Sequence, residues 1–305
     1  IGFLGGDFTN DQSSNAILEE MSGQLVNRGP DSAGIWLDSL SKIALGHRRL
    51  AVVDLSPAGY QPMTSGSNRY VMTYNGEIYN SNEIRNELIK SRVTINWRGH
   101  SDTETLLAGF DAWGIRETIS RVTGMFAIAV WDKELEQLTL IRDRLGEKPL
   151  YYGWQGSGSN KVFLFGSELK ALKKHPQFIN DIDRGSLALY MRYCYVPAPH
   201  SIYKGIMKVE PGTIVTVTLQ ESEHTTEKYW NALDVVRTGA ESPFEGTDAE
   251  VTNDLDIALR KTISQQMMAD VPLGAFLSGG IDSSAVVALM QAQSSRPIKT
   301  FTIGF

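Results

Sequence analysis

Short apolar runs with a two-residue period recur along the chain as far as Leu219. Such alternation places one face of a segment against a core, so these runs predict β-strands at 1–6, 70–76, 125–132, 137–143, 162–167 and 213–219. Two stretches with helical spacing stand between them. Residues 101–114 begin with Ser101 and Glu104 at the spacing of a capping box, and residues 184–194 are apolar over about three turns. We therefore predict helices flanking a largely antiparallel sheet system.

The pattern changes after residue 220. Residues 221–246 are polar and have no regular period, so we expect a linker there. Thr247 and Glu250 form a second capping-box pair, and apolar residues follow it on one helix face at Val251, Leu255, Ala258, Leu259, Ile263 and Met267. The order strand, glycine-rich turn, helix, strand then fits residues 274–305, which is how an α/β unit with a parallel sheet begins.

This organisation gives a first domain at 1–220, a linker at 221–246 and the start of a second domain at 247–305. A length of 305 residues also favours two domains, each with a core of its own. An α/β domain with only two strands cannot cover both faces of a parallel sheet, however. We therefore expect the second domain to be incomplete within these residues.

Composition and charge narrow the class of partner. The chain is 42% hydrophobic and 21% charged, which is ordinary for a globular protein and unlike a disordered one. A net charge of −6 without a basic run offers no surface for nucleic acid or for an anionic membrane. No apolar stretch approaches the roughly 20 residues of a membrane-spanning helix. We expect small-molecule partners, no nucleic acid and no membrane.

Cys194 is the only cysteine, which excludes an intrachain disulfide and favours a cytoplasmic location. It ends an apolar helix with no base beside it in sequence, so we interpret it as a buried structural thiol. The five histidines lack the paired spacing of a zinc site. The sequence does not fix the oligomeric state, and a homodimer is left open.

The stretch "SGGIDSS" at 278–284 follows an apolar run and opens a helix. Gly279 and Gly280 allow a ligand to approach the backbone, and the hydroxyls of Ser278, Ser283 and Ser284 can donate with the helix N–H groups. Asp282 would repel a bare phosphate, so we assign it to Mg²⁺. The alternative is a plain strand-to-helix turn.

In three stretches of the first domain, polar or charged residues stand at the end of an apolar run, where site residues are common: "GHRRLAVVD", "YNGEIYN" and "RGHSDTE". Arg49 can grip a carboxylate, and Glu77 with Asp102 can hold an ammonium group, so together they suit an α-amino acid. Asn75 and the N–H of Gly76 offer two donors to an oxyanion. Taken singly, each residue also fits a structural role, in a surface ion pair, a hairpin turn or a first helical turn.

"SGGIDSS" resembles the pyrophosphate loop of ATP pyrophosphatases. With "NRGPDSAG", "GMFAIAVWD", "RDRLGEKPLYY" and "GSELKAL", the first domain resembles class II glutamine amidotransferases, and nearly the whole chain resembles the glutamine-hydrolysing asparagine synthetases. The resemblance implies an α+β N-terminal-nucleophile four-layer sandwich, two antiparallel sheets between helices, followed by the start of an α/β parallel-sheet ATP-pyrophosphatase domain.

The resemblance also implies site residues. The glutamine site would consist of Arg49, Leu50, Ala51, Val52, Val53, Asn75, Gly76, Glu77 and Asp102. The ATP site would consist of Leu277, Ser278, Gly279, Gly280, Asp282, Ser283, Ser284 and Ile303.

In this family an N-terminal cysteine attacks the glutamine amide, with its own α-amino group as base. The ammonia released is transferred to an aspartate that ATP has converted to its adenylate, which yields asparagine, AMP and pyrophosphate. The chain as printed begins at Ile1 and has no such cysteine. We expect the nucleophile to precede Ile1, and the printed residues to bind glutamine better than they hydrolyse it.

Other functions share part of this pattern. Phosphoribosyl amidotransferases and hexosamine-phosphate synthases have the first domain but no pyrophosphate loop, so "SGGIDSS" disfavours both. A related ligase that amidates another carboxylate, for example on a sugar, and a non-catalytic domain that binds glutamine or ATP both remain open.

Overall fold

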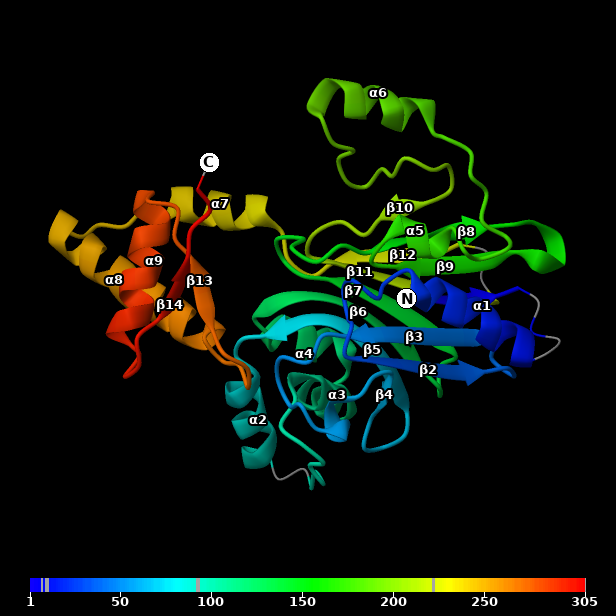
Figure 1. The fold of residues 1–305 in the computed structure, drawn as a ribbon, viewed down its shortest axis with the longest axis horizontal. Coiled ribbons are helices and arrows are strands. Elements are labelled where there is room, and N and C mark those ends of the chain that lie inside the picture. The colour runs from blue at the N-terminus through cyan, green and yellow to red at the C-terminus, as the bar shows by residue number, and fades with distance from the viewer. Residues whose placement is uncertain (7, 9–10, 92–93, 221–222, 305) are drawn as a thin grey trace. The chain divides into compact units, whose positions relative to one another are not determined.

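The computed structural model describes residues 1–304 apart from 7, 9–10, 92–93 and 221–222. Two compact units are present: residues 1–51 with 56–232, and residues 52–55 with 233–305. Figure 1 shows the elements of both.

Two antiparallel sheets form the first unit, and in the described residues each has six strands. The first sheet has the order β10 (Met207–Lys208), β8 (Tyr151–Gln155), β9 (Val162–Gly166), β1 (Gly2–Gly5), β3 (Ile43–Arg49) and β2 (Ser32–Asp38). The second has the order β12 (Thr225–Lys228), β11 (Thr213–Val217), β7 (Gln137–Arg142), β6 (Gly124–Asp132), β5 (Tyr70–Ile78) and β4 (Met63–Thr64).

Helices and two short 3₁₀ turns complete the first unit. The helices are α1 (Asp11–Gly23), α2 (Ser81–Lys90), α3 (Asp102–Trp113), α4 (Ile115–Arg121), α5 (Leu169–Leu172) and α6 (Arg184–Tyr193). The 3₁₀ turns are η1 (Pro57–Gly59) and η2 (Gly158–Asn160).

Three buried clusters show how these elements are layered. Ile43, Val71 and Trp131 belong to a cluster between the two sheets, where the inward faces of their strands meet. A second cluster joins the first sheet to α1 and α5, and a third joins the second sheet to α2 and α3. The predicted four-layer sandwich, helix, sheet, sheet, helix, is confirmed.

The second unit contains α7 (Ala232–Glu241), whose first residue still belongs to the first unit, then α8 (Asp248–Gln266), β13 (Gly274–Phe276), α9 (Ile281–Ala292) and β14 (Lys299–Phe301). β13 and β14 pair in parallel, as predicted. The capping box at the start of α8 is also confirmed, because Thr247 accepts from the Glu250 N–H and Glu250 accepts from the Thr247 N–H.

Other expectations differ from the structure. Among its described residues the second unit buries Met290 but forms no core cluster, because two strands and three helices leave apolar faces such as those of Leu255 and Phe301 exposed. Residues 221–222, the start of the expected linker, lie outside the described residues. The rest of that segment contains β12, which adds an edge strand to the second sheet, and all of α7.

The interpretation of Cys194 as a buried thiol is wrong. Cys194 is exposed, and it caps the end of α6 in the left-handed conformation, with its N–H donating to the Tyr190 carbonyl. The apolar side chains of α6 do not indicate burial, since Met191 is itself 76% exposed. Within the described residues, no helix combines the length and the apolar character needed to cross a membrane.

Candidate active site

Asn75 and Gly76 lie inside β5, where they pair with Ala127 and Phe126 of β6. This position excludes the hairpin turn that an Asn-Gly pair often forms. The side-chain nitrogen Nδ2 of Asn75 is buried and has no hydrogen-bond partner. A Cβ atom on Gly76 would lie 2.0 Å from the Met125 carbonyl oxygen, so only glycine fits there. An unpaired buried donor costs on the order of 1–3 kcal/mol, so a ligand oxygen that accepted from Nδ2 would remove this cost.

The Asp102 carboxylate is buried at the start of α3. Its Oδ2 accepts from the Tyr74 hydroxyl at 2.8 Å and from the Ile78 N–H at 2.9 Å, and its Oδ1 accepts from the Thr103 N–H at 2.8 Å. Burial raises the pKa of Asp102, whereas these hydrogen bonds favour the charged form. Asp102 is thus held in one orientation beneath β5.

Glu77 extends the acidic character of this region. Burial raises its pKa, the neighbouring Asp102 carboxylate raises it further, and Lys148 lowers it. Two partly desolvated carboxylates that repel each other favour a cation between or beside them. The pair is therefore suited to bind an ammonium group.

Arg49 is the last residue of β3 and is buried. Its Nη1 donates to the Ser56 carbonyl at 3.4 Å, and its guanidinium lies 5.7 Å from the centre of the Tyr60 ring. Two residues earlier, His47 Nδ1 lies 3.1 Å from Thr73 Oγ1 of β5. This contact joins the strand that carries Arg49 to the strand that carries Asn75.

His47 itself was not predicted as part of the site. Burial lowers its pKa to about 3, and the positive charge of Arg49 contributes. The ring is therefore neutral at pH 7. Alternation along β3 places His47 and Arg49 on the same face of that strand, which is the signal that could have identified His47.

The other residues of the expected glutamine site follow Arg49 directly in the chain. Leu50 is 59% exposed, and the Ala51 N–H donates to Asp31 Oδ2 at 2.8 Å. Val52 and Val53 belong to the second unit, in which the Val52 carbonyl accepts from the Asp270 N–H at 2.9 Å. Their role in binding glutamine stays a prediction.

The "RDRLGEKPLYY" stretch forms a loop held by its first two residues. The buried Asp143 carboxylate accepts N–H groups from Phe126, Leu145, Glu147 and Lys148. Arg142 donates to the carbonyls of Gly146, Lys148 and Val209. The loop fixes the backbone at Lys148, whose charge acts on Glu77.

In the second unit, "SGGIDSS" connects β13 to α9. Gly279 has a left-handed φ of +79°, and an added Cβ would meet nothing within 4 Å. Ser283 Oγ accepts from the Ser278 N–H at 3.3 Å and lies 3.0 Å from Ser278 Oγ, which closes the loop. Gly280 caps α9 without a side-chain hydrogen bond. The two glycines before the helix therefore leave its first N–H groups accessible to a ligand.

The other expected nucleotide contacts lie at the ends of the two parallel strands. The Leu277 N–H donates to the Phe301 carbonyl at 2.9 Å, and Thr302 Oγ1 donates to the Leu277 carbonyl at 2.7 Å. Ile303 follows and is 71% exposed. Leu277 and Ile303 are thus close to the ends of adjacent strands, as predicted.

Asp282 lies in the first turn of α9. Among the described residues, no group of three or more His, Cys, Asp or Glu side chains is arranged to hold a metal ion. One carboxylate would fit Mg²⁺ if this loop bound phosphate, because this ion commonly takes one or two protein carboxylates and completes its shell with phosphate oxygens and water.

Two family models match the chain. One is described as a glutamine amidotransferase domain and matches residues 1–230; the other is described as asparagine synthase and matches residues 254–305. The asparagine synthetase (glutamine-hydrolyzing) 3 of Bacillus subtilis strain 168 is 34% identical over 300 residues, which cover 94% of this chain and 45% of the relative. The asparagine synthetase (glutamine-hydrolyzing) 1 of the same organism is 35% identical over 290 residues, which cover 95% and 43%. The chain thus spans less than half the length of these relatives.

A solved structure has a similar fold. The glutamine phosphoribosylpyrophosphate amidotransferase from B. subtilis, complexed with ADP and GMP, superposes with a TM-score of 0.51 at 16% identity, over 99% of this chain and 64% of that one. The glutamine amidotransferase model covers residues 1–230, which is most of the chain, so the chain belongs to the glutamine amidotransferase domain family, and its residues 254–305 are similar to asparagine synthases.

Proposed function

We propose that this chain is part of an ATP-dependent amide ligase that hydrolyses glutamine and transfers the ammonia to an adenylated aspartate, giving asparagine, AMP and pyrophosphate. The observation that carries the glutaminase half is the buried, unpartnered Nδ2 of Asn75 beside Gly76. Donors fixed in advance at a developing negative charge are a large source of catalysis in acyl transfer.

The roles of the other residues follow from their charges. Arg49 binds the α-carboxylate of glutamine with its guanidinium, and Glu77 with Asp102 binds the α-ammonium group. Asn75 Nδ2 and the Gly76 N–H receive the side-chain oxygen as it becomes an oxyanion. The scheme requires as nucleophile a cysteine that is activated by its own α-amino group.

The second unit supplies the nucleotide loop. Ser278, Gly279, Gly280, Ser283 and Ser284 bind the phosphates of ATP, Leu277 and Ile303 contact the adenine, and Asp282 holds Mg²⁺. The metal ion, when bound, neutralises the charge on the departing pyrophosphate. The loop geometry and the absence of a Walker-type lysine in "SGGIDSS" favour this assignment over kinase-like chemistry.

The test uses the full-length protein and two assays: ammonia release from glutamine, and pyrophosphate release with aspartate and either glutamine or free ammonia. Asn75→Ala should lower glutamine hydrolysis by roughly 100- to 1,000-fold and leave ammonia-dependent pyrophosphate release within about twofold. Equal loss of both activities would contradict the two-site scheme. Pyrophosphate release that did not depend on aspartate would contradict aspartate as the acceptor.

A further inference from the structure

Tyr74 makes a buried contact that the pattern of polar residues did not reveal. It precedes Asn75 on β5, and its side chain belongs to the buried cluster between the second sheet and α3. Successive side chains of a strand point to opposite faces, so Tyr74 lies on the face opposite to Asn75. From that face its hydroxyl reaches Asp102 Oδ2 at 2.8 Å.

Hydrogen bonds hold both the backbone and the side-chain hydroxyl of Tyr74. Its backbone N–H donates to Gln61 Oε1 at 2.7 Å, and Gln61 Nε2 donates to Thr103 Oγ1 at 3.3 Å, next to Asp102. Tyr74 is 3% exposed, and burial together with the Asp102 carboxylate raises its pKa well above the usual value. The phenol therefore stays protonated and donates to the carboxylate at neutral pH.

This contact joins two parts of the proposed glutamine site. β5 carries the oxyanion donors, whereas α3 carries the carboxylate for the α-ammonium group. These groups serve opposite ends of one substrate, so the distance between them must be constant for both to bind at once. The Tyr74 hydroxyl and the Ile78 N–H, both from β5, donate to Asp102 Oδ2, and the hydroxyl is the donor that a substitution can remove.

We propose that Tyr74 is a positioning residue for glutamine: its hydroxyl sets the orientation of the Asp102 carboxylate and favours its charged form, so that Asp102 can bind the α-ammonium group. The proposal rests on the proposed glutaminase function. Tyr74 acts through Asp102 and does not touch the substrate.

The experiment compares Tyr74→Phe with Tyr70→Phe in the full-length protein. Tyr70 is buried in the same cluster and the same strand, and it contacts the Phe110 ring, so Tyr70→Phe also removes a hydroxyl and keeps a ring. For each variant the glutamine KM, the kcat and the pH profile of kcat/KM are measured. The melting temperature and ammonia-dependent pyrophosphate release show that the variants are folded.

Tyr74→Phe should raise the glutamine KM roughly 10- to 100-fold, the range expected for a hydrogen bond to a charged group, with kcat changed by less than about twofold. The acid limb of kcat/KM should move to higher pH, because the Asp102 carboxylate loses a donor that favours its charged form. Tyr70→Phe should change neither quantity. In an Asp102→Asn background, Tyr74→Phe should have little further effect on KM.

A glutamine KM and an acid limb like those of the wild type, or equal effects of both substitutions, would overturn the role of Tyr74. Absence of glutamine hydrolysis in the wild-type protein would instead overturn the proposed function, and the role of Tyr74 with it.

Discussion

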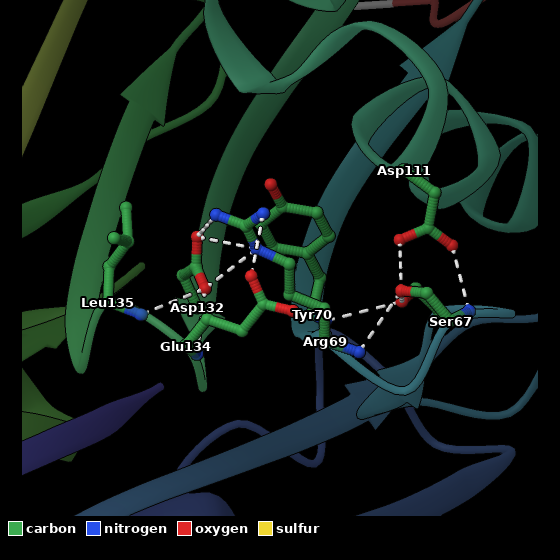
Figure 2. A network of polar contacts seen from close by, with 8 residues as sticks. Ser67, Arg69, Tyr70, Asp111, Asp132, Glu134 and Leu135 are labelled. Carbon is green, nitrogen blue, oxygen red and sulfur yellow. Dashed lines mark hydrogen bonds and ion pairs between the residues drawn. The ribbon is translucent and has the colours of Figure 1, made fainter.

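The guanidinium of Arg69 and the carboxylate of Asp132 form a two-point ion pair, with Arg69 Nη2 2.7 Å from Asp132 Oδ2 and Arg69 Nε 3.0 Å from both oxygens. Figure 2 shows that this pair joins two turns of the second sheet. Asp132 Oδ1 also accepts the N–H groups of Glu134 and Leu135, which closes the turn between β6 and β7. Asp132 is buried, whereas Glu134, the second acidic partner of Arg69, is 65% exposed.

We expect Asp132→Ala to lower the free energy of unfolding by about 2–4 kcal/mol, because it removes an acceptor from two turn N–H groups and from a guanidinium. Glu134→Ala is the matched control, and its effect should stay below about 1 kcal/mol since exposed ion pairs contribute little. Urea denaturation followed by tryptophan fluorescence measures both. Similar losses in the two variants would show that the burial of Asp132 is unimportant.

Replacing Arg49 should separate glutamine hydrolysis from ammonia-dependent pyrophosphate release. Arg49→Ala should raise the glutamine KM by roughly 10- to 100-fold, because a carboxylate loses a charged donor. Ammonia-dependent pyrophosphate release should be unchanged. Arg48→Ala is the control: Arg48 neighbours Arg49 on β3, but its Nε donates to the Gly29 carbonyl. An equal rise of the glutamine KM in both variants would exclude Arg49 as the specific contact.

Alternation predicted most strands of the first unit because one face of each is packed in a core. β5, β6 and β7 lie where the runs at 70–76, 125–132 and 137–143 placed them. Apolar spacing also predicted the helix α6, but the burial expected near its end is wrong, because apolar residues of α6 are exposed. Apolar spacing predicts a helix, but it does not show what covers that helix.

Short sequence patterns correctly predicted only one of the two hydrogen bonds of the capping box expected at Ser101 and Glu104. Ser101 caps α3 by accepting the Glu104 N–H, as the spacing predicted. The Glu104 carboxylate, however, accepts the N–H groups of Arg98 and Gly99 and thereby fixes the segment before the helix. Tyr74 and Asp102 are 28 residues apart, and only the packing of α3 under β5 brings them together. Contacts of this kind depend on tertiary structure, and no short motif encodes them.

His175 should make stability depend on pH. Burial lowers its pKa to about 4, its ring packs 4.9 Å from the centre of the Phe3 ring, and its Nδ1 accepts the Gln177 N–H, which requires the neutral form. The unfolded chain, with a histidine pKa of about 6.5, therefore binds more protons than the folded chain between pH 4 and 6.5. The stabilising contribution is complete above about pH 6.5 and is lost as the pH falls towards 4.

At pH 5 this difference corresponds to about 2 kcal/mol for His175 alone. His175→Gln should make the fall in unfolding free energy between pH 7 and pH 5 smaller by about that amount. Denaturation at several pH values measures it, and Ser159→Ala, at an exposed position of η2, should retain the wild-type dependence. An unchanged pH dependence in the His175 variant would contradict the effect.

Replacing Asp282 tests the nucleotide site proposed for the second unit. If Asp282 holds Mg²⁺ at the phosphate loop, Asp282→Ala should lower aspartate-dependent pyrophosphate release at least about 100-fold, since a metal ligand and the charge it neutralises are lost. Glutamine hydrolysis should stay within about twofold of the wild-type rate. Asp248→Ala is a suitable control, because Asp248 also lies in the first turn of a helix of the same unit and interacts with the helix dipole in the same way. Unchanged pyrophosphate release in Asp282→Ala, or an equal loss in Asp248→Ala, would show that the carboxylate of Asp282 only stabilises the start of α9.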